Sequence, residues 1–287
     1  MLDRNRAIAE GAKTGTLMEG RRGLIMGVAN DHSIAWGIAR ALSAQGAELA
    51  FTFQGDAQGK RVRPLAESIG SRIVIPCDVG NDSDLDAGFG LLAEAWGGLD
   101  FVVHAIAYSD KNELKGRYVE TSRQNFLSTL NISCYSFTDV ARRAARMMKP
   151  GGALVTLTYG GASRVMPNYN VMGVAKAALE ASVRYLAADL GKDGIRVNAI
   201  SAGPMRTLAG SAVGDARMVF KWNKAHSPLK KNIELEHVGG AALYLLSELS
   251  AGVTGEIHFV DAGYNVIGMP PTGDLKGWIA PENGDPE

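Results

Sequence analysis

Two tyrosines and a lysine have the types and the spacing needed for carbonyl or enolate chemistry. Tyr159 ends an apolar, β-branched run from Gly152, and Tyr169 and Lys176 lie where an Ala-rich helix is expected, from about Asn170 to Leu190. A step of seven residues makes nearly two helical turns, so Lys176 returns to within ~20° of the direction of Tyr169, ~10 Å further along the axis. A phenol can donate a hydrogen bond to a developing oxyanion, and a nearby ammonium lowers the cost of that charge.

The N-terminal part of the chain predicts a nucleotide site. A short apolar strand, Leu24 to Val28, contains Gly27 and is followed by a helical pattern that begins near Ser33 and Ile34. Free N–H groups and the helix dipole make such a strand, turn and helix an anion site that suits a pyrophosphate. The fingerprint G-x-G-x-x-G is absent, and Ser33 is expected to cap the helix. An ordinary β–α turn remains the alternative.

The residue after the second strand bears on the choice of cofactor. That strand runs from Glu48 to Phe53 and is followed by Gln54. In a dinucleotide-binding fold this position meets the adenosine ribose, where an acid favours NAD and an arginine favours the 2′-phosphate of NADP. Gln54 has no adjacent cation, so NADH is favoured over NADPH. NADPH remains an alternative cofactor because three cations lie close in the sequence, namely Lys60, Arg61 and Arg63.

Two polar residues near the next strands have competing interpretations. Asp78 follows a short strand, Ile73 to Ile75, and its carboxylate can accept a hydrogen bond from the adenine amino group. Alternatively, Asp78 caps the helix expected from Asp82. His104 lies in the apolar strand that follows, and we expect a hydrogen-bonded core residue there rather than a catalytic base.

Strand and helix patterns alternate along the whole chain. This alternation predicts an α/β protein with a parallel sheet that is covered by helices on both faces. We therefore expect a single doubly wound, Rossmann-like domain with a seven-stranded sheet. The further elements that we expect are the helices Asp82–Trp96, Ser122–Met148 and Glu234–Leu246 and the strands Phe101–Ile106, Arg196–Ile200 and Glu256–Val260.

Composition excludes several classes of protein. The 287 residues are 46% hydrophobic, which suits one large core, and 30 basic and 30 acidic residues give a formal net charge of +0. This balance gives no electrostatic reason to expect nucleic acid or an anionic membrane as a partner. No apolar stretch is long enough to span a membrane, and the first residues lack a secretory core. Cys77 and Cys134 have no metal-ligand spacing, so we expect no metal and free thiols in the cytoplasm.

Several blocks of sequence together resemble the bacterial enoyl-acyl-carrier-protein reductases of dissociated fatty-acid synthesis, a divergent branch of the short-chain dehydrogenase/reductase superfamily. The resemblance covers roughly residues 22–268. Ordinary members of the superfamily place the lysine four residues after the catalytic tyrosine, where this chain has Gly173, and Lys176 comes at the seventh position. The blocks are Gly27 with Ser33–Gly37, Cys77–Val79, Pro167–Lys176, Arg196–Pro204, Arg206–Thr207 and Thr254–Glu256.

The resemblance implies a catalytic role for the three residues first noted. NADH would deliver a hydride to the β-carbon of a trans-2-enoyl thioester on acyl carrier protein, and Tyr169 would donate a hydrogen bond to the enolate oxygen. Lys176 would hold the hydroxyls of the nicotinamide ribose. Tyr159 matches the second active-site tyrosine of the family, which shapes the pocket and helps to orient the substrate.

The resemblance also implies cofactor contacts, a substrate contact and an assembly. Ala107 stands where the family has glycine, and its methyl group would protrude toward the substrate or an inhibitor. We also expect a homo-oligomer, most simply a tetramer. The implied cofactor contacts are Gly27, Ser33 and Ile34 near the pyrophosphate, Gln54 at the adenosine, Asp78 and Val79 at the adenine, Ile106 at the nicotinamide ribose, and Met205 and Thr207 at the nicotinamide and phosphates.

Four segments are expected along the chain. Residues 1–21 form an extension, residues 22–268 the reductase domain, residues 208–231 a flap over the substrate, and residues 269–287 a Pro-containing tail with Trp278. The flap is basic, which suits either an ordinary solvated helix face or docking of the acidic carrier protein. Its cations are Arg217, Lys221, Lys224, Lys230 and Lys231.

Two other functions compete with enoyl reduction. A carbonyl or alcohol oxidoreductase of the broader superfamily is disfavoured because Gly173 stands where its lysine is required. A catalytically silent, NAD-bound sensor is disfavoured because Tyr159, Tyr169 and Lys176 are all present.

Overall fold

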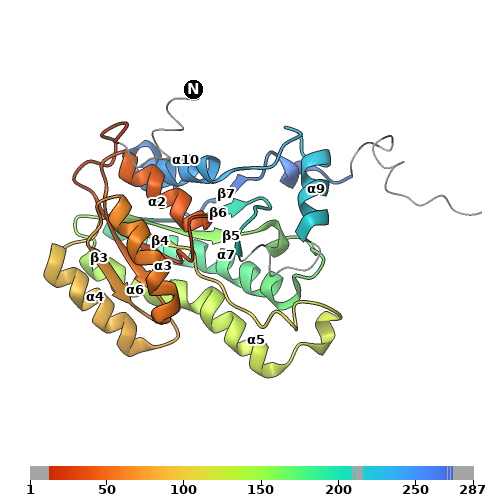
Figure 1. The fold of residues 1–287 in the computed structure, drawn as a ribbon, viewed down its shortest axis with the longest axis horizontal. Coiled ribbons are helices and arrows are strands. Elements are labelled where there is room, and N and C mark those ends of the chain that lie inside the picture. Colours follow the sequence, from red (N-terminus) through yellow and green to blue (C-terminus); the bar gives the residue numbers. More distant parts are fainter. Residues whose placement is uncertain (1–12, 209, 211–215, 270, 272, 274–287) are drawn as a thin grey trace, which may run out of the picture.

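The computed structural model describes residues 13–208, 210, 216–269, 271 and 273. Within them, seven strands form one parallel sheet in the order β3-β2-β1-β4-β5-β6-β7 (Figure 1). The expected doubly wound, seven-stranded parallel sheet is therefore confirmed. The strands are β1 (Arg22–Met26), β2 (Glu48–Phe53), β3 (Ile73–Pro76), β4 (Phe101–His104), β5 (Gly152–Thr158), β6 (Ile195–Ala202) and β7 (Ile257–Val260).

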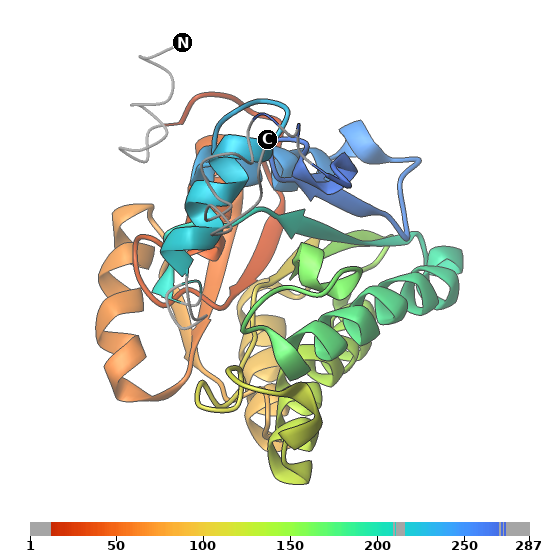
Figure 2. The ribbon, with the colours of Figure 1, turned by 90° about the vertical axis from the view of Figure 1, so that its right-hand side faces the viewer.

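Helices cover both faces of the sheet (Figure 2). On one face, Phe51 and Phe101 pack with side chains of three helices, namely α2 (Ile34–Ala44), α3 (Gly55–Ser68) and α10 (Leu235–Leu246). On the other face, Leu24 and Val102 pack with α4 (Asp82–Trp96), α6 (Ser136–Met147) and α7 (Asn170–Leu190). A parallel sheet buried on both faces needs continuous apolar strands, which is the pattern that the sequence shows.

The order of the strands reverses at β1. Leu24 of β1 lies opposite Ala50 of β2 on one side and opposite Val102 of β4 on the other. The chain first builds β2 and β3 on one side of β1 and later builds β4 to β7 on the other side. In such sheets, ligands bind outside the carboxyl ends of the strands at this reversal.

The long helix expected over Ser122–Met148 is interrupted. The structure has α5 (Arg123–Leu130), a π-helical turn (Asn131–Tyr135) and then α6. Within the π turn, the hydroxyl of Ser133 donates to the carbonyl of Tyr108 and accepts from the N–H of Tyr108, both at 2.9 Å. The wider turn therefore ties the helix to the loop that follows β4.

Two further helices were not expected. α3 buries only Gly59, Val62 and Ala66 and contains Pro64, so its apolar stripe is too narrow to stand out in the sequence. α9 (Ala216–His226) lies in residues 208–231, where the sequence suggested a flap and gave no bounds for a helix.

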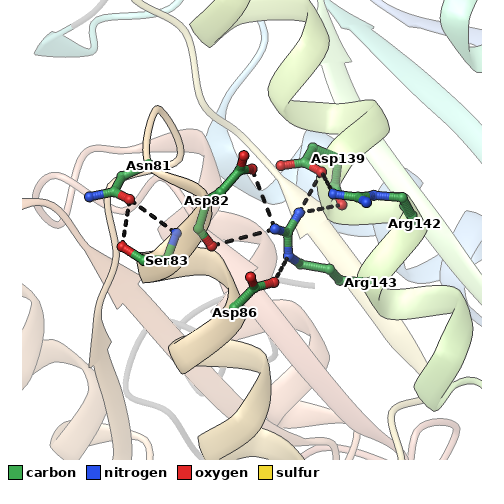
Figure 3. Close-up of polar contacts among 7 residues, drawn as sticks. All are labelled: Asn81, Asp82, Ser83, Asp86, Asp139, Arg142 and Arg143. Carbon is green, nitrogen blue, oxygen red and sulfur yellow. Dashed lines mark hydrogen bonds and ion pairs between the residues drawn. The ribbon is translucent and has the colours of Figure 1, made fainter.

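An ionic cluster around the buried Arg143 and Asp139 joins α4 to α6 (Figure 3). The guanidinium of Arg143 is 6% exposed and contacts Asp82, Asp86 at 2.7 Å and Asp139. Burial alone would raise the pKa of Asp139, but hydrogen bonds from Arg142 and Arg143 outweigh burial and hold that pKa below its usual value. Asp139 therefore stays ionised, and the cluster fixes the two helices that follow β3 and α5.

The residues before β1 belong in part to the packed core. Met18 is 1% exposed, and its N–H donates to the carbonyl of Gln45 at 2.9 Å. The segment 13–21 therefore packs against the end of α2. The rest of the expected extension, residues 1–12, and the tail prolines and Trp278 lie outside the described residues, apart from Pro271. No helix among the described residues is long and apolar enough to cross a bilayer.

Candidate active site

The turn between β1 and α2 has the shape of an anion site. Gly27 has φ +100°, and a Cβ atom there would lie 2.1 Å from the carbonyl oxygen of Ala105. Glycine is therefore required where the chain leaving β1 passes close to the chain leaving β4. Ser33 occupies the N-cap position of α2, but its hydroxyl accepts from the N–H groups of Ala29 and Asn30 at 3.0 Å and makes no capping bond. The predicted capping bond is therefore wrong, and the Ser33 side chain leaves the first helical turn open to a ligand.

Gln54 and Asp78, the residues predicted for the adenosine end, are bonded to each other. The Gln54 side-chain amide donates to Asp78 at 2.8 Å, and the second carboxylate oxygen of Asp78 accepts from the N–H of Gly80. Asn81, not Asp78, caps α4 by accepting from the N–H of Ser83. The alternative in which Asp78 caps this helix is therefore wrong, and its adenine role stays a prediction.

A cavity of about 740 Å³ opens at the carboxyl ends of β1, β2, β3 and β4. Cys77 also borders it, and burial, with the nearby Asp84 and Asp78, raises the pKa of the Cys77 thiol to about 12. This thiol is therefore protonated and unreactive at neutral pH. The predicted contacts that line this cavity together are Gly27, Gln54, Asp78, Val79, Ile106 and Ala107.

The other predicted contacts lie outside the lining of this cavity. Ser33 and Ile34 begin α2, and Lys176 lies on the buried face of α7. Met205 and Thr207 follow β6, where the N–H of Thr207 donates to the carbonyl of Met205 at 3.0 Å. The Thr207 hydroxyl accepts from the N–H of Gly210 at 2.9 Å, so this segment forms a tight turn at the same end of the sheet.

The two tyrosines contact each other directly. The rings of Tyr159 and Tyr169 meet edge to face with centroids 5.2 Å apart. Tyr169 is the N-cap residue of α7 rather than part of the helix, and it is buried. Burial raises the pKa of Tyr169 above its usual value and raises that of Tyr159 to about 12, with a smaller contribution from Tyr264. Both phenols therefore stay protonated and able to donate hydrogen bonds at neutral pH.

Lys176 is held at the base of the same site. Its ammonium is buried and donates to the carbonyl of Leu157 at 2.8 Å, near the end of β5. Burial lowers the pKa of Lys176 to about 8, although Cys134 and Glu180 counteract part of this effect. The ammonium has further N–H groups with which to bind a ligand.

Glycines allow Tyr169 to pack closely against the end of β5. A Cβ atom at Gly161 would lie 2.4 Å from the Tyr169 ring, and one at Gly173 would lie 2.9 Å from the carbonyl oxygen of Gly161. A lysine cannot occupy position 173 in this backbone without displacing Gly161. The structure therefore gives a steric reason why the lysine comes three residues later.

His104 is a core residue, as expected. Its ring nitrogens lie 3.1 Å from the hydroxyl of Thr156 and 2.9 Å from that of Ser136. Burial lowers its pKa to about 3, with a smaller contribution from Lys176. The imidazole is therefore neutral at physiological pH, and both of its nitrogens have partners.

Two residues that shape the site escaped sequence reasoning. Ser133 ties Tyr108 to the π turn, as described above. Asn170 follows Tyr169 with φ +29°, and its side-chain amide lies 3.2 Å from the carbonyl oxygen of Glu113 and 3.4 Å from that of Gly116. The only signal was the pair of asparagines that flank Tyr169, since asparagine tolerates positive φ better than most residues.

Comparison with known proteins places the chain among reductases. A family model described as enoyl-(acyl carrier protein) reductase matches residues 27–265. The chain is similar to an NADH-dependent enoyl-(acyl-carrier-protein) reductase of Rhizobium meliloti (strain 1021), with 65% identity over 91% of this chain and 97% of that protein.

Two solved structures share the fold closely. The enoyl-(acyl-carrier-protein) reductase of Anaplasma phagocytophilum in complex with NAD has 60% identity and a TM-score of 0.88 over 91% of this chain and 99% of that one. The Bacillus cereus enoyl-acyl carrier protein reductase with NADP+ and an indole naphthyridinone has 49% identity and a TM-score of 0.87 over 88% of this chain and 100% of that one.

Proposed function

This chain belongs to the enoyl-(acyl carrier protein) reductase family, and we propose that it reduces the trans-2 double bond of enoyl thioesters on acyl carrier protein with NADH. This is a reaction of dissociated fatty-acid synthesis, which we assign to the cytoplasm. The observation that carries the proposal is the edge-to-face pair of the half-buried Tyr159 and the buried Tyr169, with a lysine in the family's seventh position.

The residues present fit a dinucleotide. The glycine turn at Gly27 and the open first turn of α2 suit the pyrophosphate, while Gln54 and Asp78 offer partners for the adenosine. NADH, when bound, supplies the hydride that adds to the β-carbon of the substrate. Lys176, already anchored to Leu157, would hold the ribose hydroxyls.

Tyr169 would stabilise the charge that forms on the substrate. Addition of a hydride to the β-carbon moves negative charge to the thioester oxygen, and the protonated phenol of Tyr169 would donate a hydrogen bond to it. Tyr159, packed against that ring, would orient both the phenol and the thioester. A preorganised donor of this kind contributes roughly 10²–10³ in rate.

One assay separates the proposed activity from its two alternatives. Loss of NADH absorbance is followed with a crotonyl thioester, with a simple ketone and with no acceptor. The proposal requires turnover of the thioester alone. Reduction of the ketone would indicate a carbonyl reductase, and cofactor binding without turnover of either substrate would indicate a sensor.

The structure favours NADH over NADPH. The 2′-phosphate of NADPH would approach the Asp78 carboxylate that holds Gln54. Of the nearby cations, Arg63 lies over the Phe53 ring with its guanidinium carbon 5.0 Å from the centroid, and Arg61 donates to the carbonyl of Ala29 at 2.8 Å. We expect kcat/KM to be at least about tenfold higher with NADH, equivalent to ~1.4 kcal/mol.

This preference is measured with both cofactors and the same crotonyl thioester. Equal efficiency, or a preference for NADPH, would overturn it. If either result is found, Arg61→Gln tests whether Arg61 binds the 2′-phosphate. Arg61 lies beside the turn between β1 and α2 and is the cation best placed to reach that phosphate.

The basic side of α9 is the proposed docking face for the carrier protein. Arg217, Lys221 and Lys224 lie on this helix, and an acyl carrier protein is strongly acidic. We expect Lys221→Glu to raise KM for crotonyl-acyl carrier protein several-fold and to leave KM for crotonyl-coenzyme A within twofold. Equal effects on both substrates would instead favour an ordinary solvated helix face.

The exposed face of α7 supports assembly of subunits. Ala175 and Ala187 pack inside the subunit, whereas Ala177 is exposed, so the alanines of this helix are divided between two faces. Val174 is 37% exposed and Tyr185 is 77% exposed, and the exposed Ala177 lies between them. Small and apolar side chains on one helix face allow a second helix to approach closely.

We therefore expect a homotetramer in which α7 contacts a neighbouring subunit. Light scattering at micromolar concentration should give four times the mass of the 30.4 kDa chain. A monomeric mass would contradict this assembly and would leave the exposed face of α7 without a partner.

A further inference from the structure

A second cavity lies beside Tyr159, on the side toward β6 and α9. Its volume is about 140 Å³, and its walls are mostly apolar. It is separate from the cavity at the ends of β1 to β4, with which it shares no lining residue. Its walls include Tyr159, Met166, Pro204, Val219, Trp222 and Tyr264.

One polar side chain in this wall is incompletely bonded. Asn223 of α9 is 2% exposed and borders the cavity. Its side-chain N–H donates to the Oδ1 atom of Asn232 at 3.2 Å, whereas its own Oδ1 atom is buried and accepts no hydrogen bond from the protein. A buried acceptor without a donor is costly, so a ligand or water is expected to supply one.

The orientation of the Asn223 amide is fixed by its neighbour. Asn232 donates from its side-chain nitrogen to the carbonyl of Phe220 at 3.1 Å, so its oxygen must face Asn223. Asn223 must then present its nitrogen to Asn232 and its oxygen elsewhere. The unsatisfied atom is therefore an acceptor, and its partner must carry an N–H or O–H group.

This inference rests on the proposed reaction. In the thioester substrate of that reaction, N–H and O–H donors occur only in the pantetheine arm. An enoyl chain is hydrocarbon and has no donor. The pantetheine arm that carries the thioester has two amide N–H groups, ~5 and ~10 Å from the thioester carbonyl carbon at about 1.2 Å per bond.

The cavity is placed to receive that arm. Tyr159 lies 5.2 Å, between ring centroids, from the tyrosine that would bind the thioester oxygen. Across the cavity, the indole N–H of Trp222 donates to the Tyr264 hydroxyl at 2.9 Å, and Asn223 is the next residue of α9. We infer that this cavity binds the pantetheine arm and that Asn223 accepts a hydrogen bond from one of its amides. The apolar walls would pack against the methylene groups between the amides.

Kinetics with matched thioesters test this assignment. kcat/KM is measured at saturating NADH for the crotonyl thioesters of pantetheine, of N-acetylcysteamine and of butanethiol, which have two, one and no amides. We expect Asn223→Leu to lower the ratio of pantetheine to butyl thioester about tenfold and to change kcat/KM of the butyl thioester less than twofold. Each ratio is taken within one protein sample, so the folded fraction cancels.

Asn232→Asp is the matched control. It loses the bond to the carbonyl of Phe220 but keeps an oxygen that accepts from the Asn223 amide nitrogen, so the Asn223 oxygen keeps its direction and the ratio should stay within twofold of wild type. Should Asn223→Leu fail to fold, Asn223→Ala removes the acceptor without adding apolar bulk.

Three results would overturn the assignment. The first is an unchanged ratio in the Asn223 variants, as expected if the oxygen binds only water. The second is an equal loss with the pantetheine and butyl thioesters or a matching loss in Asn232→Asp, either of which indicates a structural role. The third is an unchanged ratio with improved use of longer enoyl chains, which would assign the cavity to the acyl chain. If wild type reduces none of the three thioesters, the proposed function itself fails.

Discussion

Tyr169→Phe is expected to lower the turnover of a crotonyl thioester by roughly 10²-fold or more and to leave the affinity for NADH nearly unchanged. The substitution removes one hydroxyl group that would donate to the enolate oxygen, and it keeps the ring that packs against Tyr159 and Gly161. The loss should fall on kcat, because the hydrogen bond strengthens as charge develops in the transition state.

The measurement pairs steady-state kinetics with NADH binding followed by fluorescence. Tyr244→Phe is the matched control, because it makes the same change at a residue of α10 that is 36% exposed and lines neither cavity. Near-normal turnover of Tyr169→Phe would mean that another group stabilises the enolate. Its neighbour Tyr159 would then be the first candidate.

Lys176→Ala should weaken NADH binding by about tenfold to a hundredfold. A hydrogen bond from a charged group contributes about 1.5–3 kcal/mol, and this ammonium is buried beside the site where the nicotinamide ribose would lie. The variant should raise the Kd for NADH, with a loss of kcat/KM that follows from it. Lys176→Met, which keeps most of the apolar stem, separates the lost charge from lost packing.

The lowered pKa of Lys176 adds a pH dependence. Burial brings this pKa to about 8, so the ammonium is charged below that pH and loses its proton as the pH rises through it. The affinity of wild type for NADH should therefore fall between pH 7 and pH 9, and that of Lys176→Ala should not. A variant that binds NADH as tightly as wild type at pH 7 would remove Lys176 from the cofactor site.

The sequence sufficed for the fold because the strand and helix patterns alternate strongly. The helix from Asp82 to Trp96 and the helix from Asn170 to Leu190 begin and end where the apolar periods predict. A doubly wound sheet then requires the predicted cofactor residues to meet at the carboxyl ends of the strands. Gly27, Gln54, Asp78 and Ile106 do line one cavity there.

The sequence did not predict the hydrogen bonds of side chains that can reach several backbone partners. Ser33 stands at the expected N-cap, but its hydroxyl bonds backward to the turn rather than forward to the helix. The π turn at Ser133 depends on a contact with Tyr108, 25 residues away. Such bonds depend on tertiary distances, which local patterns do not encode.

The candidate site was likewise predicted only in part. The types and spacing of Tyr169 and Lys176 indicated the chemistry, and Tyr169 stands directly before the helix that was expected from about Asn170. The unsatisfied oxygen of Asn223 could not be foreseen, because it depends on the orientation of Asn232, nine residues later.

The central claim is that hydride adds to the β-carbon of an enoyl thioester. It is tested most directly with NADH carrying deuterium at the transferable position and a crotonyl thioester as acceptor. Mass spectrometry and NMR of the product should place one deuterium on carbon 3 of a butyryl thioester. Deuterium on carbon 1, in an aldehyde or alcohol, would contradict the account and assign the chain to carbonyl reduction.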